Sequence, residues 1–156
     1  MGEIEIRTAS DADLGGVVVS CAALFAEDGA TRDRLRDSSW PATHGPKWCA
    51  DLLADRAALV LVAVSDGEVV GHLVGSFAEP SEMWTGARAE LVSLYVRPVL
   101  RGRGVGGRLV DTFVAWAKDR GAVRLHVTAY GTNEQALALY QKHGFAPLSI
   151  TLAADL

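Results

Sequence analysis

The sequence predicts one domain of the α/β class, α+β in detail, with a central mixed and mostly antiparallel sheet flanked by about four helices. Short apolar runs rich in β-branched residues alternate with longer stretches that repeat apolar residues at helical spacing. The length of 156 residues suits a single domain, here 1–156, that buries about two-thirds of its unfolded surface. Apolar residues make up 49% and charged residues 22%, which are ordinary globular values that disfavour disorder.

The N-terminal third predicts a strand, a helix and an irregular stretch. Ile4 and Ile6 alternate with charged residues, which is typical of a strand with one buried face. Ser10 then suits the N-cap of a helix. Residues 27–46 have no clean period and predict a loop or a broken pair of helices, after which Pro46 begins another helix. Apolar residues at helical spacing follow Ser10: Leu14, Val17, Val18, Cys21, Leu24 and Phe25.

The rest of the chain predicts a hairpin followed by alternating elements. Asp66-Gly67 lies between apolar runs at 58–64 and 69–77, which is the strongest hairpin signal in the chain. Glycines at 121 and 144 suit helix C-termini. The later elements are a strand at 90–96, a helix at 108–118, a strand at 123–129, a helix at 133–143 and a last strand at 148–152.

Charge and composition exclude several classes of protein. The net charge of −4 disfavours a nucleic-acid binder, because phosphate backbones call for a basic face. The start of the chain does not resemble a signal peptide, and no apolar stretch, the longest being 57–64, approaches a membrane span. We therefore expect a soluble, cytoplasmic protein without a membrane partner. Cys21 and Cys49 are expected to be reduced thiols, with one disulfide as the alternative.

The run from Arg101 to Gly107 holds four glycines between a predicted strand and a predicted helix. Each glycine destabilises the start of the helix, so the need for a tight turn alone does not explain four of them. Bare backbone N–H groups at the positive end of a helix dipole bind phosphate. The run therefore predicts a phosphate site.

Two familiar phosphate-binding loops fit this run poorly. A dinucleotide-binding loop follows its strand at once and has an acid about 20 residues later, whereas here 97–100 intervene and 125–127 carry no acid. A nucleoside-triphosphate loop needs Lys and then Ser or Thr, where this chain has Arg108 and Leu109.

Two further patterns occur in order, about 30 residues apart. Arg101, Gly104 and Gly106 match R/Q-x-x-G-x-G/A, and residues 133–145 read N-x-x-A-x-x-L-Y-x-K-x-G-F. They resemble motifs A and B of the GNAT superfamily of acyl-CoA-dependent N-acetyltransferases, and the resemblance spans essentially the whole chain. It implies acetyl-CoA as co-substrate, no metal, and direct acetyl transfer to a primary amine within a ternary complex.

The resemblance also implies roles for individual residues. Backbone amides of 102–107 would hold the coenzyme A pyrophosphate, with arginine charge beside them. Backbone groups of 94–96 would pair with pantetheine, and one amide there would polarise the thioester carbonyl. The cofactor-binding set is Leu94, Tyr95, Val96, Arg101, Gly102, Arg103, Gly104, Val105, Gly106, Gly107, Asn133 and Tyr140.

The resemblance assigns Tyr140 as the general acid that protonates the leaving thiolate, whereas its apolar helical spacing alone would suit a core tyrosine. Asn133 suits a helix N-cap as well as a pantetheine contact. Glu90 is the best-placed general base, although it also suits a structural or solvent-facing role. A water chain is another alternative, and the rival carboxylates are Glu27, Asp28 and Glu79.

Among the other side chains that could carry chemistry, His72 and His126 fit hydrogen-bonded core positions, and no zinc-ligand spacing occurs. Neither cysteine lies near the motifs, which disfavours a cysteine acyl-enzyme. The tryptophans of the irregular regions suit the wall of an amine pocket or ordinary core packing; they are Trp40, Trp48 and Trp84.

The residues leave several functional points open. A non-catalytic CoA-binding or sensory module of the same fold is one alternative, and a different acyl-CoA or an oxygen or sulfur acceptor is another. The acceptor could be a small molecule or a protein, and the chain could act alone or as a homodimer.

Overall fold

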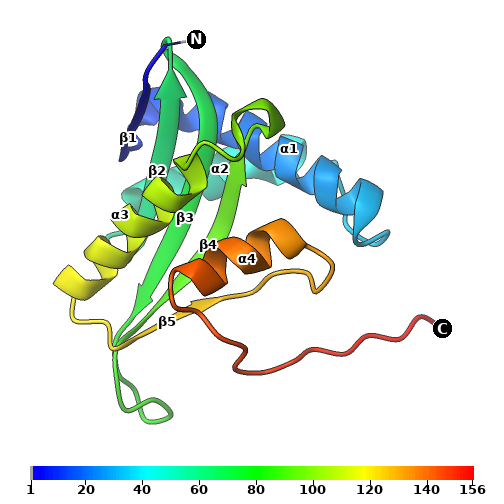
Figure 1. The fold of residues 1–156 in the computed structure, drawn as a ribbon. Coiled ribbons are helices and arrows are strands. Elements are labelled where there is room, and N and C mark those ends of the chain that lie inside the picture. The colour runs from blue at the N-terminus through cyan, green and yellow to red at the C-terminus, as the bar shows by residue number, and fades with distance from the viewer. Residues whose placement is uncertain (1) are drawn as a thin grey trace.

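The computed structural model describes residues 2–156 and contains one sheet with the strand order β1-β2-β3-β4-β5 (Figure 1). The first four strands are antiparallel, and β5 runs parallel to β4, so the predicted mixed and mostly antiparallel sheet is confirmed. The strands are β1 (Ile4–Thr8), β2 (Ala58–Ser65), β3 (Glu68–Ala78), β4 (Arg88–Val96) and β5 (Arg124–Val127).

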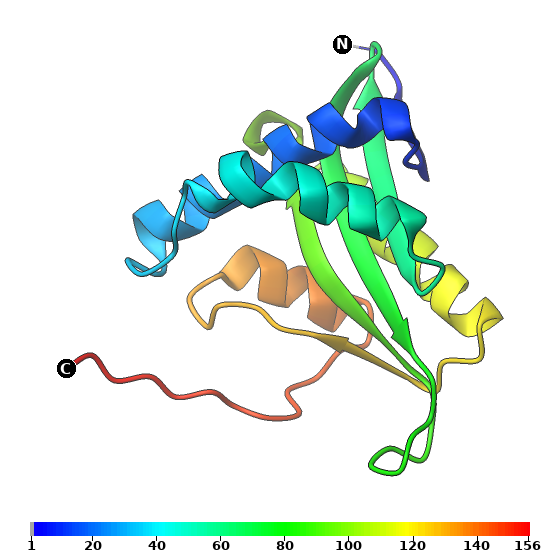
Figure 2. The same cartoon turned by 180° about the vertical axis from the view of Figure 1, so that it is seen from behind.

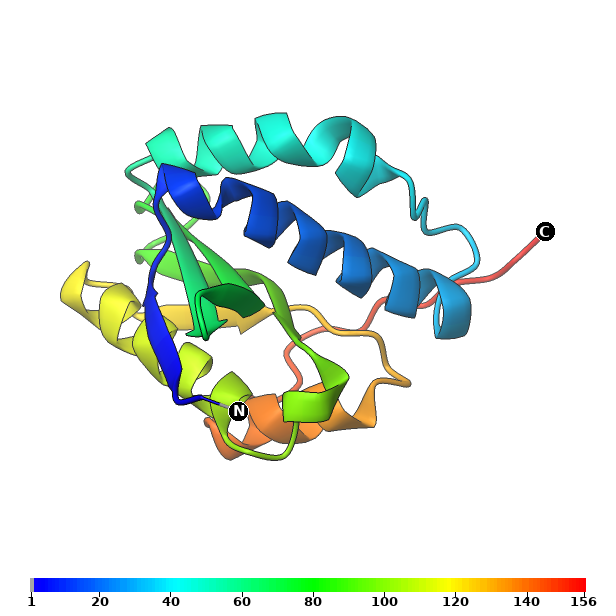
Figure 3. The same cartoon turned by 90° about the horizontal axis from the view of Figure 1, so that it is seen from above.

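Within the described residues 2–156, four α-helices cover the sheet as two pairs. Figure 3 shows the first two helices on one face of the sheet and the last two on the other. In Figure 2, where the molecule is seen from behind, the first pair lies in front of the sheet. The helices are α1 (Leu14–Thr31), α2 (Trp40–Ala54), α3 (Val105–Asp119) and α4 (Glu134–Lys142), with short 3₁₀ turns η1 (Asp11–Asp13) and η2 (Pro98–Leu100).

Alternating residues of β2 show how the sheet divides the core. Leu59 and Leu61 belong to the larger apolar cluster, which they share with α3. Val60 and Val62 point the other way into a smaller cluster with Val17 of α1. A strand with both faces covered reads as a continuous apolar run, which explains the uninterrupted apolar sequence of β2.

The predicted hairpin between β2 and β3 is confirmed. Ser65 pairs with Glu68, and the two residues between them have positive φ, 51° at Asp66 and 77° at Gly67. Two consecutive positive φ values define the type I′ turn, whose twist matches that of the flanking strands.

Of the two predictions for 27–46, the broken pair of helices is confirmed, but the second helix begins earlier than predicted. The first helix continues to Thr31 and the second begins at Trp40, so Pro46 lies inside a helix and does not start one. Aromatic packing outweighs the weak local signal, because the Trp40 ring stacks on Phe25 with centroids 5.4 Å apart and meets Trp48 edge-on at 5.8 Å.

The predicted last strand at 148–152 is wrong, because residues 146–156 form no regular element. This segment leaves α4 as an extended ribbon (Figures 1 and 2). The apolar alternation suits a strand, but a strand also requires a neighbour for its backbone groups, and none of the described residues pairs with this segment.

The prediction about membrane spans also needs correction. Asp11–Thr31 forms a helical run of 21 residues that is long and apolar enough, by length and composition alone, to cross a membrane. A helix that covers a core passes the same test, and Val17 on this run packs with Val60 and Val62 of β2.

Candidate functional site

The turn between β4 and α3 exposes unpaired backbone donors. Gly104 is the N-cap of α3 and no side chain caps this end. Arg108 donates the first backbone hydrogen bond of the helix, to the carbonyl oxygen of Gly104 at 3.0 Å, while within residues 2–156 the N–H groups of 105–107 have no hydrogen-bond acceptor. Unpaired N–H groups at the start of a 15-residue helix form an anion site.

The structure explains three of the four glycines of this turn, for two different reasons. Gly102 and Gly104 have φ of 78° and 81°, a left-handed conformation that side chains disfavour, yet a Cβ there would meet nothing within 4 Å. A Cβ at Gly106 would lie 3.2 Å from Leu139, and one at Gly107 would lie 3.7 Å from His143. The first pair therefore shapes the turn. Gly106 lets α4 approach α3 closely, whereas a Cβ at Gly107 would make only an ordinary van der Waals contact.

The two arginines of the turn have different surroundings. Arg101 pairs with Glu27 of α1 at 2.9 Å, and its Nε donates to the carbonyl oxygen of Val96, also at 2.9 Å. Its guanidinium lies 5.2 Å from the Tyr95 ring centroid. Arg103 is exposed and forms no ion pair in the described part of the chain. The charge of Arg101 is therefore compensated, whereas that of Arg103 is available to an anion.

The strand that leads into this turn loses its neighbour half-way along. β4 pairs with β5 only from Arg88 to Leu91, while its pairing with β3 continues to Val96. The β3–β4 register shifts between Val74 and Gly75, where Ser93 and Leu91 are the respective partners, so Val92 is the extra residue of a bulge. Past Leu91, the backbone groups of β4 that face away from β3 have no strand partner among residues 2–156.

Tyr140 lies on α4 with 8% of its surface exposed, and its ring packs edge-on against Phe145 at 5.8 Å. Burial raises its pKa to about 12, so the phenol is protonated at neutral pH. Its hydroxyl has no hydrogen-bond partner within residues 2–156, and it is not fully buried. The residue is thus a core tyrosine with a hydroxyl free to donate.

Asn133 is the N-cap of α4, as the alternative interpretation predicted. Its side-chain oxygen accepts a hydrogen bond from the backbone N–H of Ala136 at 3.1 Å. This bond occupies the oxygen and leaves the side-chain NH₂ group for other contacts.

Glu90 is the one candidate carboxylate on the strand that loses its neighbour. It is exposed, forms no ion pair within residues 2–156, and alternates with Ala89 and Leu91, which face the larger cluster. Its side chain therefore belongs to the α1–α2 face of the sheet. Its partner in the parallel register is His126 of β5.

Two of the three rival carboxylates are less available for proton transfer because they form ion pairs. Glu27 pairs with Arg101 and with Arg32, the latter at 3.3 Å. Asp28 is buried and pairs with Arg32 at 2.9 Å. Glu79 lies exposed just beyond the end of β3.

The two strand histidines behave differently. His72 is fully buried, with Nδ1 2.5 Å from the Ser20 hydroxyl and Nε2 2.8 Å from that of Ser93, so the expected hydrogen-bonded core histidine is confirmed. His126 departs from that expectation, because its buried Nε2 has no hydrogen-bond partner in the described chain. The sequence places His126 in a predicted strand, but it shows neither the pairing of that residue with Glu90 nor the unpaired ring nitrogen.

The three tryptophans do not gather at one place. Trp40 and Trp48 pack together between α1 and α2, as ordinary core packing predicts. Trp84 lies in the β3–β4 connection under the guanidinium of Arg88, 4.2 Å from its ring centroid, and lines a hollow of about 140 Å³. The three tryptophans therefore do not form one wall of an amine pocket.

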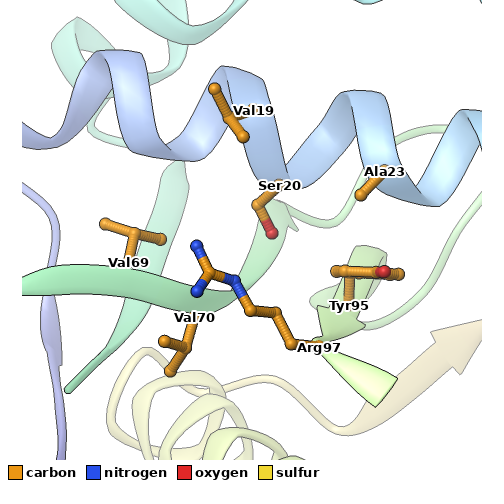
Figure 4. A pocket seen from close by; sticks show the side chains of 7 residues that line it. All are labelled: Val19, Ser20, Ala23, Val69, Val70, Tyr95 and Arg97. Carbon is orange, nitrogen blue, oxygen red and sulfur yellow. The ribbon is translucent and has the colours of Figure 1, made fainter. Parts of the chain in front are cut away.

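A cavity of about 210 Å³ lies between α1 and the adjoining ends of β3 and β4 (Figure 4). Figure 4 shows the Arg97 side chain running below Ser20, with Tyr95 beside it. Arg97 pairs with Glu68 at 2.7 Å. The first-turn residues of α3 do not line this cavity. Among residues 2–156, no three potential metal ligands come together.

Comparisons with known proteins agree on one family. Residues 26–145 match the family described as acetyltransferase (GNAT) family. A mycothiol acetyltransferase of Jonesia denitrificans is 36% identical over 89 residues, which are 57% of this chain and 27% of that protein. Across eight curated relatives, the match covers from 27% to 58% of the relative's length.

Solved structures share the fold at lower sequence identity. A mutant form of the BH1408 protein from Bacillus halodurans has a TM-score of 0.88 at 20% identity, covering 97% of this chain and 99% of that one. The aminoglycoside N-acetyltransferase AAC(6')-Iy in complex with CoA has a TM-score of 0.79 at 15% identity, covering 100% of this chain and 96% of that one.

The burial of His72 predicts a specific pH dependence of stability. Burial lowers its pKa from 6.5 to about 4, so between these values the unfolded chain binds a proton that the folded chain does not. The contribution of neutral His72 to the free energy of unfolding is complete above pH 6.5. It falls by about 2–3 kcal/mol as the pH drops to 4. Urea unfolding of the His72→Gln variant should show a shallower loss over this range than the wild type, whereas His44→Gln, at an exposed site, should match the wild type. Equal slopes in His72→Gln and the wild type would contradict the assignment.

Proposed function

This chain belongs to the acetyltransferase (GNAT) family, and we propose that it transfers an acetyl group from acetyl-CoA to a primary amine by direct attack within a ternary complex. The observation that carries the proposal is the junction of β4 and α3. After the η2 turn, unpaired amides at the start of α3 follow a strand whose backbone has lost its β5 partner. One stretch of chain thus offers N–H donors for the pyrophosphate of CoA and an open strand edge whose backbone could pair with the amides of pantetheine.

On the donor side, amides of the 102–107 turn would hold the pyrophosphate of CoA. Arg103 supplies the uncompensated charge of the turn, while Arg101 braces it through Glu27 and the Val96 carbonyl. The unpaired backbone of Leu94 to Val96 would align pantetheine. An N–H on this strand would also stabilise charge that develops on the thioester oxygen.

Two side chains would move protons. Tyr140 is protonated at neutral pH and its hydroxyl is unpaired, so it can donate to the departing thiolate. Glu90 lies on the α1–α2 face and carries an uncompensated charge, so it can take the proton that the ammonium must lose. The acceptor would approach from the α1–α2 face of the sheet. The donor would lie on the opposite side, against α3 and α4.

The reaction itself is tested by measuring release of the CoA thiol from acetyl-CoA over a panel of small amines, polyamines and peptides. Acceptor-dependent release would support the proposal. Tight binding of acetyl-CoA with no release on any acceptor would instead support the CoA-binding module, and faster release from a longer acyl-CoA would correct the donor.

The phosphate assignment predicts different effects at the two ends of α3. Gly104 and Gly121 have φ of 81° and 84°, and in both cases a Cβ would meet nothing within 4 Å. Substitution by Val imposes the same left-handed strain at either site, about 1–3 kcal/mol. Gly104→Val should also abolish CoA binding in isothermal titration because the side chain blocks backbone approach. Gly121→Val should keep that affinity, and a similar loss in both variants would mean that strain alone is responsible.

The acid role predicts a selective loss in Tyr140→Phe. Turnover should fall on the order of 10²-fold while CoA affinity stays near the wild-type value, since only the donated proton is removed. Tyr130→Phe is the matched control, because its hydroxyl donates to Asp33 at 3.0 Å instead of remaining unpaired. Unchanged turnover in Tyr140→Phe would remove Tyr140 as the acid.

The base role predicts a pH-dependent loss in Glu90→Gln. The amide cannot accept a proton, so turnover at neutral pH should fall and should recover as the pH approaches the pKa of the acceptor amine. The pH–rate profile measures this recovery. A profile with the wild-type shape would exclude Glu90 and favour a water chain.

A further inference from the structure

Four ionisable side chains share one face of the short ladder between β4 and β5. Arg88 lies opposite Arg124 in the register, and Glu90 lies opposite His126. The residues that alternate with them on both strands pack in the larger apolar cluster, so these four side chains belong to the α1–α2 face. Figure 2 shows α1 and α2 crossing the upper part of this face, with none of the described helices in front of the end of the sheet where β4 and β5 begin.

Arg88 and Arg124 place two positive charges side by side without a negative partner. Like charges directly opposite each other destabilise a pair of strands. Neither arginine forms an ion pair within residues 2–156, and the carboxylates that flank them in sequence form none either. These carboxylates are Glu79, Glu82, Glu90 and Asp119. An anion from outside the described chain would relieve the repulsion.

The two arginines border a hollow of about 140 Å³ that also has an aromatic wall. The guanidinium of Arg88 lies over the Trp84 ring, 4.2 Å from its centroid. Stacking of this kind fixes the plane of a guanidinium and leaves the N–H groups at its edge for a planar anion. The hollow is thus lined by an oriented donor, a second cation from Arg124 and the apolar side chain of Val123.

Two buried atoms on this face lack hydrogen-bond partners. Nε of Arg88 and Nε2 of His126 are the buried side-chain nitrogen or oxygen atoms that have no partner within residues 2–156. Buried polar groups in proteins are nearly always paired. The occurrence of both unpaired atoms on one short ladder therefore indicates that a polar ligand completes this face.

We propose that this hollow binds a carboxylate of the acceptor, so that the amine acetylated by this chain carries an acid group. This inference rests on the proposed function, which brings the reacting ammonium to Glu90. The ammonium lies beside the one carboxylate of the face, and the acid group of the acceptor lies beside the two arginines. A guanidinium matches a carboxylate because two parallel N–H groups can bind its two oxygens.

The spacing of charges on β4 sets the length of this acceptor. Arg88 and Glu90 are two residues apart, which is about 6.6 Å along a strand. Arg88 stacks on Trp84, in the connection before β4, and forms no ion pair with Glu90. An α-amino acid, whose amine and carboxylate share one carbon atom, is too short to reach both. The acceptor class is therefore an ω-amino acid, with several carbon atoms between its amine and its acid group.

Binding of 6-acetamidohexanoate tests the site without the reaction, because this compound has the carboxylate but no free amine. Isothermal titration should detect its binding to the wild type, and Arg88→Gln and Arg124→Gln should each raise the dissociation constant about tenfold or more. Arg120→Gln is the matched control, since Arg120 also stacks on a tryptophan, Trp116 at 4.7 Å, but does not line the hollow. Thermal unfolding of each variant checks that the fold is unchanged.

Two further ligands make the titration decisive. The neutral 6-acetamidohexanamide should not bind, and inorganic phosphate distinguishes an acceptor site from a site for a free anion. Phosphate binding that depends on Arg88, without binding of the carboxylate probe, would overturn the proposal. Equal binding of the acid and the amide would also overturn it, as would a dissociation constant that is unchanged in Arg88→Gln and Arg124→Gln.

Acceptor kinetics test the substrate class. 6-Aminohexanoate and 6-aminohexanamide differ only in the acid group, so kcat/KM from release of the CoA thiol should be about tenfold higher or more for the acid. Arg88→Gln should remove this preference, and glycine should be a poor acceptor. Binding of the probe without release on any amine would overturn the proposed reaction and leave the carboxylate site. Release on other amines with no preference for the acid would overturn the role of the hollow in acceptor binding.

Discussion

The short parallel ladder between β4 and β5 governs the layout of this molecule, because it ends at Leu91 while β4 continues to Val96. Four paired residues are enough to hold β5 on the sheet. Beyond them, β4 has an open edge on one side and stays paired with its antiparallel partner β3 on the other, so the polar groups on its outer side are free. The proposed site consists of this free half-strand and the helix start that follows it.

Local signals predicted the parts of the fold that are decided locally. Asp66-Gly67 predicted its hairpin because the turn requires positive φ, and Gly121 and Gly144 both adopt positive φ after their helices. The start of α2 could not be predicted in this way. It depends on the Trp40 ring stacking on Phe25 of another helix, and no window around Pro46 contains that information.

The candidate site shows the same division. The glycine pattern predicted an unpaired helix start, and the structure contains one. The partner of Arg101 could not be predicted, since Glu27 comes from a distant helix and its position depends on the packing of α1. The unpaired Nε2 of His126 likewise depends on which groups surround it. The residues 148–152 have the pattern of a strand, but pairing depends on a neighbour that no alternation of side chains can specify.

The Glu27–Arg101 ion pair joins α1 to the turn before α3, and α1 covers the face from which we propose that the acceptor approaches. Arg32 shares Glu27 with that arginine and also holds Asp28, so a small network of charges connects the two halves of the site. A substitution at the end of α1, on the proposed acceptor side, would therefore also disturb the support of the proposed donor turn. The two proposed halves of the site are joined through the same ion pairs.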